Sequence, residues 1–477
     1  MEISLLSVEL FGLKVPHPRR FRMAEDAVPP TLIFIVLGVL ALLTPAQNDT
    51  FWHLRSGQYM WETKSLLTSE SFSHTSYGRV VGDQWWLSQL VFYAAYQVGG
   101  AFLLTVLAGG CALGASWLSY RLVRGPLEIR VATLGFLAFA TVAEWAVRPQ
   151  VISLLFIAIG AYLIERDRIS WLPALCVVWA NVHAMVVLGV ALSVACVLEA
   201  AIWSRRFLAR DVLVGLGCVI APMLSPLGLH YWPYLLATVG TSRELRLQEY
   251  RLSLDAASIP FWCAVALLIL LAARRWRTLR EHPRQDRILL VSAAILAVAA
   301  ATAVRNVAFF AVIATPVLAR LWARNPRPER VRPAGPGGYI LVTLAALAAA
   351  AVVAVKWQNV ASLGWEPLSD RTITAIRACP DPMFNHFEDG GYLMWALPGK
   401  RVFVDSRVDS YPLEFLQRSR TADLFGEYRS LFRDYSIACA VVRTGSPLDA
   451  NLRKDDMRVT YGDSSRTVFV IPSGILR

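Results

Sequence analysis

Charged residues are scarce in this chain, and that scarcity excludes most water-soluble folds. Of its 477 residues, only 17 % are charged whereas 56 % are apolar, and the mean hydropathy is +0.46. A soluble domain needs a more polar surface than this composition supplies. The composition therefore predicts a polytopic membrane protein.

Cysteine is also scarce and follows no metal-binding pattern. None of the seven cysteines belongs to a CxxC pair or to a Cys/His group with the spacing of a metal site. Cys379 and Cys439 lie near the C-terminal end, and they could pair if that part of the chain is in an oxidising compartment. Packing explains the other five, which lie in apolar runs: Cys111, Cys176, Cys196, Cys218 and Cys263.

The net charge of +12 does not indicate a nucleic-acid partner, because of where the charge lies. Residues 357–477 carry 15 basic and 15 acidic residues, so the whole excess, 32 basic against 20 acidic, lies in residues 1–356. Basic residues between hydrophobic runs normally record membrane topology. We therefore expect no nucleic acid among the partners.

Eleven apolar runs are candidate membrane spans. Several are shorter than the roughly 20 residues of a perpendicular helix, so we expect tilted or broken helices. With a cytoplasmic N-terminus, the inside segments carry 23 Lys and Arg and the outside segments carry 8, which agrees with the positive-inside rule. The runs are 31–46, 101–120, 131–147, 150–164, 170–182, 184–203, 211–225, 257–273, 288–304, 307–321 and 338–355.

Three parts of the chain follow from this topology. They are a cytoplasmic segment at 1–30, a membrane domain at 31–356 with a large outer loop at 47–100, and an outer domain at 357–477. The last part alternates β-rich runs (RVFVDSR, IACAVVR, RTVFVIP) with helical stretches at 412–424 and 427–434, which predicts a small α/β domain. The alanine- and arginine-rich composition is typical of a bacterium, so we expect the inner membrane and a periplasmic C-terminal domain.

Polar residues that are costly in lipid gather in five outer connections of this topology. The opening stretch of the first outer loop, QNDTFWHLRSGQYMW, holds three of them directly after a span. Connection by connection, the polar residues are Asp49, His53 and Arg55; Arg148 and Gln150; Asn181 and His183; Glu249; and Arg305 and Asn306. Their coincidence on one face predicts a site there.

Most of these residues also have a purely structural interpretation. Asp49 has the weakest one, because only His53 lies near it at helical spacing. The structural alternatives are an Arg148–Glu144 pair on one helix, Asn181 and His183 satisfied by neighbouring spans, a snorkelling Arg305, an interfacial anchor at His53, and a solvated Glu249. In addition, residues 52–67 and 83–97 are aromatic and amphipathic, which predicts helices along the membrane interface.

Several motifs resemble a known superfamily of membrane enzymes. A hydrophobic N-terminal span, an acid opening a large first outer loop and an outward C-terminal domain resemble the GT-C glycosyltransferases, which include protein O-mannosyltransferases, oligosaccharyltransferases and aminoarabinose transferases. NDTFWHLRSGQYM, SESFSHTSYG, VRPQ, WANVHA, RNVAFFAVIATP and GGYLMWALPGKRVFVDSRVDSYP are similar to a set of bacterial proteins usually placed near them. This closer resemblance covers about residues 30 to 477.

The resemblance implies a polyprenyl-phosphate sugar donor, an acceptor and transfer at the outer membrane face. Asp49 matches the first-loop carboxylate of the superfamily, and Glu249 could match its later acid. A D-x-D or E-x-D pair is common there, whereas this chain has QND with one carboxylate. Because Mg²⁺ and Mn²⁺ want several oxygen ligands, a divalent metal at Asp49 is in doubt.

Each polar residue then has an expected role. Asp49 can deprotonate the acceptor, and Arg148 and Arg305 can stabilise the departing phosphate. His53 and His183 can donate to the phosphate or move a proton, and the remaining outer residues would bind substrate.

In the C-terminal domain, Asp405 and Arg407 would recognise the acceptor. Gly390 and Gly391 either admit a ligand or pack closely against backbone.

Two rival functions remain open from the sequence. A transporter or flippase of a lipid-linked or anionic substrate would also need cations and imidazoles, but it usually has polar residues through the full membrane depth. A non-catalytic protein could bind cell-envelope components through its outer domain.

Overall fold

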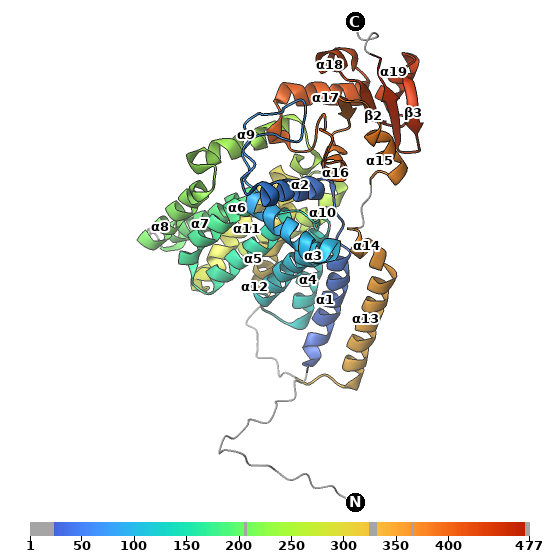
Figure 1. The fold of residues 1–477 in the computed structure, drawn as a ribbon. Helices are drawn as coiled ribbons and strands as arrows, with labels where there is room; N and C mark the ends of the chain where they lie inside the picture. Colours follow the sequence, from blue (N-terminus) through green and yellow to red (C-terminus); the bar gives the residue numbers. More distant parts are fainter. Residues whose placement is uncertain (1–22, 205–207, 324–331, 364–366, 473–477) are drawn as a thin grey trace, which may run out of the picture.

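A computed structural model of the chain describes residues 23–204, 208–323, 332–363 and 367–472. Helices α1 to α14 form a helical region, and the elements from α15 onward form a C-terminal domain that lies above it in Figure 1. The helices of the first region are α1 (Val28–Leu42), α2 (Asn48–Thr63), α3 (Trp86–Arg121), α4 (Leu127–Val142), α5 (Gln150–Glu165), α6 (Leu172–Val182), α7 (Val187–Glu199), α8 (Ala209–Ile220), α9 (Tyr231–Glu244), α10 (Ile259–Arg275), α11 (Arg284–Thr302), α12 (Val307–Trp322), α13 (Pro336–Val355) and α14 (Trp357–Ala361).

Seven described helices are long and apolar enough to cross a membrane, and eight are if the bent pair Ala209–Leu224 and Gly228–Glu244 counts as one span. The predicted spans at 131–147, 150–164 and 170–182 correspond to α4, α5 and α6, which have 16, 16 and 11 residues. A helix of 16 residues extends about 24 Å, short of the roughly 30 Å hydrocarbon core. The chain is therefore a multi-pass membrane protein, while the number eleven stays a prediction.

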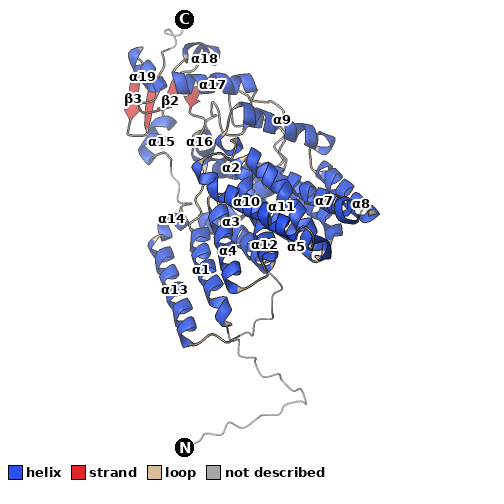
Figure 2. Cartoon of the chain, turned by 180° about the vertical axis from the view of Figure 1, so that it is seen from behind, coloured by secondary structure: helices blue, strands red, loops and turns tan. Residues whose placement is uncertain are grey.

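The interior of the helical region is built around α12. Its sequence is apolar on every side, and residues 308–321 are all buried, which is the pattern of a helix surrounded by others. By contrast, α13 lies at the edge beside α1 in both ribbon views (Figures 1 and 2), and none of its residues is buried.

The two aromatic stretches of the first loop form α2 and the first half of α3. The second half of α3 is the predicted span at 101–120, and the two halves are separated by non-helical Gly99 and Gly100. Gly100 has φ +60°, ψ −154°, a conformation that is open only to glycine. The break lets one continuous segment change direction where we expect the interface.

The C-terminal domain contains a four-stranded sheet in the order β1-β2-β4-β3, with β1 parallel to β2 and the other pairs antiparallel. Its helices pack around the sheet (Figure 2). A disulfide joins Cys379 to Cys439. The elements are α15 (Asp370–Arg377), β1 (Met383–Asn385), α16 (Gly390–Ala396), α17 (Leu413–Phe425), α18 (Arg429–Asp434), β2 (Cys439–Arg443), α19 (Pro447–Lys454), β3 (Arg458–Gly462) and β4 (Arg466–Val470).

The predicted α/β character is confirmed, with one correction. IACAVVR and RTVFVIP contain β2 and β4, and the two predicted helices are α17 and α18. RVFVDSR is not a strand of the sheet. Its backbone pairs instead with the first outer loop, because Val402 N donates to Phe72 O at 2.9 Å and Val402 O accepts from His74 N at 3.0 Å.

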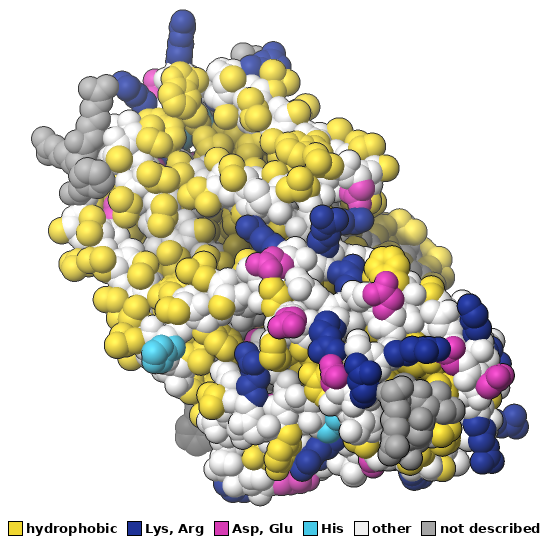
Figure 3. All heavy atoms as spheres, turned by 90° about the horizontal axis from the view of Figure 1, so that it is seen from above, with side chains coloured by type: hydrophobic (Ala, Val, Ile, Leu, Met, Phe, Trp, Pro, Cys, Tyr) yellow, Lys and Arg dark blue, Asp and Glu magenta, His cyan; other side chains and the backbone are white. Residues whose placement is uncertain are grey.

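The first loop thus holds the two parts of the molecule together. His74 also bonds the carbonyl of Met383 in β1 at 2.9 Å, and Thr75 donates to the carbonyl of Phe403 at 2.6 Å. Seen from above, charged side chains of both signs gather over the C-terminal domain, whereas hydrophobic side chains cover much of the helical region (Figure 3). This division suits one part in water and one in lipid.

Candidate active site

Polar residues from separate connections of the helical region meet beneath the C-terminal domain. They come from the start of α2, the turn between α4 and α5, the segment before α10 and the turn between α11 and α12. We call this set the ionic cluster: Asp49, Glu144, Arg148, Gln150, Glu249 and Arg305.

Arg148 lies at the centre of the ionic cluster. Its Nη1 is 3.5 Å from Asp49 Oδ2 and 3.8 Å from Glu249 Oε2, and its Nη2 is 3.6 Å from Glu144 Oε2. The pairing with Glu144 that the sequence allowed is therefore present, together with two more. A single guanidinium is shared by three carboxylates.

Local backbone contacts explain why Arg148 meets Asp49. Thr50 in the first turn of α2 accepts a hydrogen bond from Gln47 N at 3.0 Å and donates to Val147 O at 2.6 Å. Val147 N in turn donates to Pro45 O at 3.2 Å. The turn before α2 and the turn before α5 are thereby fixed to each other.

Arg305 is the second cation of the cluster and is 8 % exposed. Its Nη1 donates to Glu249 Oε1 at 2.7 Å and to the Tyr250 hydroxyl at 2.9 Å, and its Nη2 donates to Gln150 Oε1 at 3.4 Å. Among the described residues, the buried Nε atoms of Arg148 and Arg305 have no hydrogen-bond partner. Both guanidinium groups therefore keep donor capacity for an anion.

Asp49 is held by both parts of the molecule. Its Oδ1 accepts from Trp52 Nε1 at 3.1 Å and from Ser406 Oγ at 2.7 Å, while Oδ2 faces Arg148. The side chain is 31 % exposed, so a substrate can reach it. Ser406 belongs to the C-terminal domain and is a site residue that our sequence reasoning missed.

Close backbone packing beside Asp49 settles the role of the paired glycines. A Cβ on Gly391 would lie 2.4 Å from Asn48 Oδ1 and 2.5 Å from Asn48 O, and one on Gly390 would lie 2.1 Å from Val404 O. Asn48 also donates to Ser406 Oγ at 3.0 Å and accepts from Tyr392 N at 3.2 Å. The glycines let α16 approach the start of α2.

His53 is buried against aromatic rings next to the cluster. It is 3 % exposed, and its ring centroid is 3.6 Å from that of Trp52 and 6.0 Å from that of Trp85. Burial, reinforced by the positive charges of Arg148 and Arg407, lowers the pKa of His53 well below its usual range. Its imidazole is therefore neutral at pH 7, and its Nδ1 has no partner among the described residues.

The α6–α7 turn contributes more to structure than to the cluster. His183 Nδ1 lies 2.8 Å from Ser153 Oγ, and Asn181 accepts from Trp86 Nε1 and donates to Val177 O, both at 2.8 Å. Asn181 is thus satisfied by Trp86 of the neighbouring helix α3 and by a carbonyl of its own helix, in line with its structural alternative. Asn306 likewise donates to Ala299 O at 3.0 Å.

Asp405 and Arg407 are interior residues, 0 % and 5 % exposed. Arg407 Nε and Nη2 donate to Asp405 Oδ1 and Oδ2 at 2.8 and 2.7 Å, and its Nη1 is 2.9 Å from Glu70 Oε2 in the first loop. Their contacts are those of a structural clamp between the first loop and the C-terminal domain. Acceptor recognition by this pair stays a prediction that the burial does not favour.

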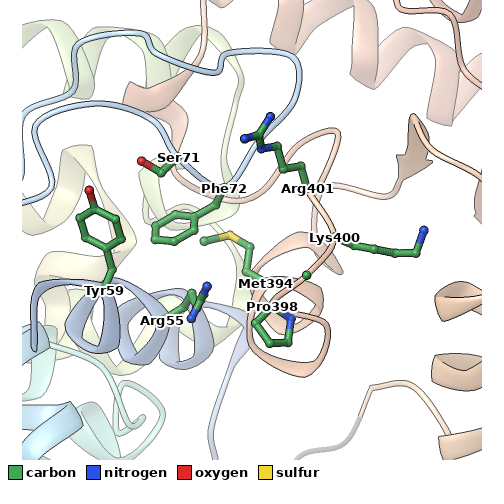
Figure 4. Close-up of a pocket in the computed structure, with 9 residues that line it drawn as sticks. Arg55, Tyr59, Ser71, Phe72, Met394, Pro398, Lys400 and Arg401 are labelled. Atoms are coloured by element: carbon green, nitrogen blue, oxygen red, sulfur yellow. The ribbon is translucent and has the colours of Figure 1, made fainter. Parts of the chain in front are cut away.

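Arg55 lies outside the cluster, in a cavity of about 310 Å³ between α2, the first loop and the turn after α16. Figure 4 shows it below Phe72 and Met394, with Tyr59 to one side and Lys400 extending away. Asp49 and Arg55 are six residues apart on α2, which places them about 9 Å apart along the helix axis.

The ionic cluster does not fit a divalent cation. Among the described residues, no group of three or more His, Cys, Asp or Glu side chains is placed to hold a metal ion. Asp49, at which the sequence leaves a divalent metal in doubt, and Glu249 both face the same nitrogen of Arg148. The guanidinium of Arg148 therefore occupies the space in which a metal ion would have to lie to bind the oxygens of both acids.

Comparisons with known proteins agree with this architecture. No model of a protein family matches the chain, and no curated protein matches it. Two solved structures share the fold. The oligosaccharyltransferase of Archaeoglobus fulgidus is 10 % identical with a TM-score of 0.54, and 92 % of this chain and 74 % of that chain are covered. ArnT from Cupriavidus metallidurans is 14 % identical with a TM-score of 0.50, and 92 % and 96 % are covered. The chain therefore has the fold that is shared by this oligosaccharyltransferase and ArnT.

Proposed function

We propose that this protein is an integral-membrane glycosyltransferase that moves a sugar from a polyprenyl-phosphate donor to an acceptor at the outer membrane face. The observation that carries the proposal is the position of Asp49. In a chain with the GT-C fold, this partly exposed carboxylate opens the first loop, and it lies 3.5 Å from one of two arginines with free donor capacity.

The chemistry needs one base and one cationic patch. Asp49 takes the proton from the acceptor nucleophile, which attacks the anomeric carbon of the donor sugar. The bond from that carbon to the phosphate oxygen breaks, and the polyprenyl phosphate leaves with the bonding electrons. Arg148 and Arg305 stabilise its charge, while Glu249 contacts both guanidinium groups and positions them.

Two observations support the outer face and the periplasm. Basic residues are concentrated in the segments that this topology puts inside. The disulfide between Cys379 and Cys439 also suits an oxidising compartment for the C-terminal domain. We therefore place the protein in a bacterial inner membrane with a cytoplasmic N-terminus.

The transporter alternative has less support. Glu199, an acid within the apolar helices, bonds Arg284 and Arg287 at 2.8 Å each. It lies sixteen residues after His183, at the far end of α7, and its ion pairs close that end of the helical region. Among the described residues, the two arginines with an unpartnered buried nitrogen, Arg148 and Arg305, lie instead in the ionic cluster.

A donor panel tests the proposal. Membranes containing wild type, Asp49→Asn or Glu62→Gln receive labelled polyprenyl-phosphate sugars, and release of label from the lipid is measured. Glu62 is an exposed acid of the same helix and serves as the control. We expect release by wild type and Glu62→Gln and a loss of about 10²- to 10⁴-fold in Asp49→Asn. Movement of unreacted donor across sealed vesicles without release would instead indicate a flippase.

A further inference from the structure

The guanidinium of Arg148 occupies a position that a metal ion would otherwise suit. Its Nη1 lies between Asp49 Oδ2 and Glu249 Oε2, at 3.5 and 3.8 Å, and Nη2 faces Glu144. Hard divalent cations bind where several carboxylate oxygens converge. Here the oxygens converge on a fixed positive charge, which would repel a metal ion placed between them.

Arg148 is held in this place by the fold. Its side chain is 16 % exposed, and the preceding residue, Val147, is bonded on both its N–H and its carbonyl by Pro45 and Thr50. Its Nε has no partner among the described residues. The backbone that carries Arg148 is therefore held in place, and its guanidinium is still able to donate to another oxygen.

We propose that Arg148 replaces the divalent cation in this site, so that sugar transfer proceeds without a metal. This rests on the proposed transferase function and deepens it. The guanidinium neutralises Asp49 and Glu249 and, with its remaining donors, meets the oxygens of the departing phosphate, for which its planar geometry is suited. The replacement of a metal ion by Arg148 also explains why the motif QND needs only one carboxylate.

Mn²⁺ binding, measured by electron paramagnetic resonance on purified full-length protein, tests this without relying on activity. We expect no Mn²⁺ bound to wild type or to the control Arg371→Ala, an exposed arginine of the C-terminal domain. Arg148→Ala frees the acids and should bind one Mn²⁺, and adding Asp49→Asn should abolish that binding. Stoichiometric Mn²⁺ on wild type that Asp49→Asn removes would overturn the proposal.

Label release provides the second readout. Wild type should keep its full rate in EDTA, and Arg148→Ala should lose about a hundredfold or more and regain part of it with Mn²⁺. Loss of wild-type release in EDTA would contradict the proposal even if Arg148→Ala fails to fold. If no donor releases label, the transferase function fails, while the Mn²⁺ measurement still decides the role of Arg148.

The cavity around Arg55 carries a second, independent inference. Arg55 is half-buried, and its guanidinium bonds the neutral amide of Gln58 at 2.8 Å. No carboxylate pairs with it among the described residues, whereas the arginines of the ionic cluster and the clamp are all paired. The nearby Lys400 is engaged by Asp381 at 3.0 Å.

Aromatic side chains line one side of this cavity. The Phe72 ring lies 5.5 Å from the Arg55 guanidinium and 5.3 Å from that of Arg407, and Tyr59 and Ser71 complete that side. We infer that the cavity binds the carboxylate or phosphate of an anionic acceptor through the guanidinium of Arg55. This too rests on the proposed function, since it places the acceptor about 1.7 helical turns from Asp49.

Thermal unfolding of purified protein tests the cavity directly. D-glucuronate or inorganic phosphate should raise the melting temperature of wild type and of Arg371→Gln but not of Arg55→Gln, and uncharged D-glucose should have no effect. A rise with glucuronate alone identifies a carboxylate sugar, and one with phosphate alone identifies a phosphate group. No rise with either anion, or an equal rise in Arg55→Gln, would refute the site. Release of label from the lipid-linked donor measures sugar transfer in a separate experiment, so a failure of this site and a failure of the transferase function can be told apart.

Discussion

Replacing Arg407 by Gln should destabilise the whole protein, because this residue clamps two parts of the chain together. Asp405 and Glu70 are both 0 % exposed and share the Arg407 guanidinium, and Tyr411 donates to Asp405 at 2.7 Å. The substitution leaves two buried carboxylates without a counter-charge.

The magnitude follows from burial. Removing one partner of a buried ion pair costs about 3–5 kcal/mol, so we expect a loss of that size for Arg407→Gln. Glu70→Gln should cost less, about 1–3 kcal/mol, because Arg407 keeps Asp405. A Gln carbonyl can also still accept from Phe72 N and Ser73 N, which lie 2.7 and 2.8 Å from Glu70 Oε1.

Unfolding of the purified full-length protein in detergent, followed by tryptophan fluorescence, measures both variants and the double variant. Arg429→Gln is the matched control. Its pair with Asp455 is on the surface, with the arginine side chain 72 % exposed, and such pairs contribute about 1 kcal/mol or less. The two clamp substitutions should be less than additive, because they break the same contact.

The clamp interpretation would be refuted by a stability of Arg407→Gln equal to that of Arg429→Gln. If the same variant raised the KM for the acceptor while kcat stayed unchanged, Arg407 would instead bind acceptor, as the sequence predicted. Unfolding and kinetics therefore separate the two roles.

Three further variants test other parts of the structure. Gly391→Ala should lower transfer activity about tenfold or more by pushing the start of α2 away, with little change in donor binding. Burial and the negative charge of Asp409 raise the pKa of Asp83 to about 7, so its stabilisation is present below about pH 4 and is lost as pH rises through 7. At pH 8, Asp83→Asn should therefore melt at a higher temperature than wild type, with a free energy of unfolding that is larger by at most about 4 kcal/mol. At pH 4 the melting temperatures of the two proteins should converge. Replacing Cys379 and Cys439 by Ser should cost about 2–4 kcal/mol, and treatment with a reductant should destabilise only wild type.

The sequence predicts those features that depend on local pattern. Long apolar runs mark the helices, and each of the eleven runs coincides with a helix or part of one. Because the chain crosses the membrane back and forth, every second connection lies on the same side of it. The meeting of Asp49 with Arg148, Glu249 and Arg305 therefore follows from the topology.

Contacts between distant segments could not be read in the same way. RVFVDSR has the composition of a strand, but its backbone partners are Phe72 and His74 in the first loop. Residues 231–244 carry no long apolar run, yet they form α9. Ser406 lies between the charged Asp405 and Arg407, and only the fold shows that the serine faces Asp49.

The contact of Asn48 with the C-terminal domain has a consequence for biogenesis. Asn48 bonds Ser406 and Tyr392, which are 358 and 344 residues further along the chain. A ribosome that has just made α2 must still translate most of the protein, and on the proposed topology the last quarter must then cross the membrane. The contacts of Asn48 and Asp49 with the C-terminal domain therefore form only at the end of synthesis, long after Arg305, the last residue of the ionic cluster, has been made.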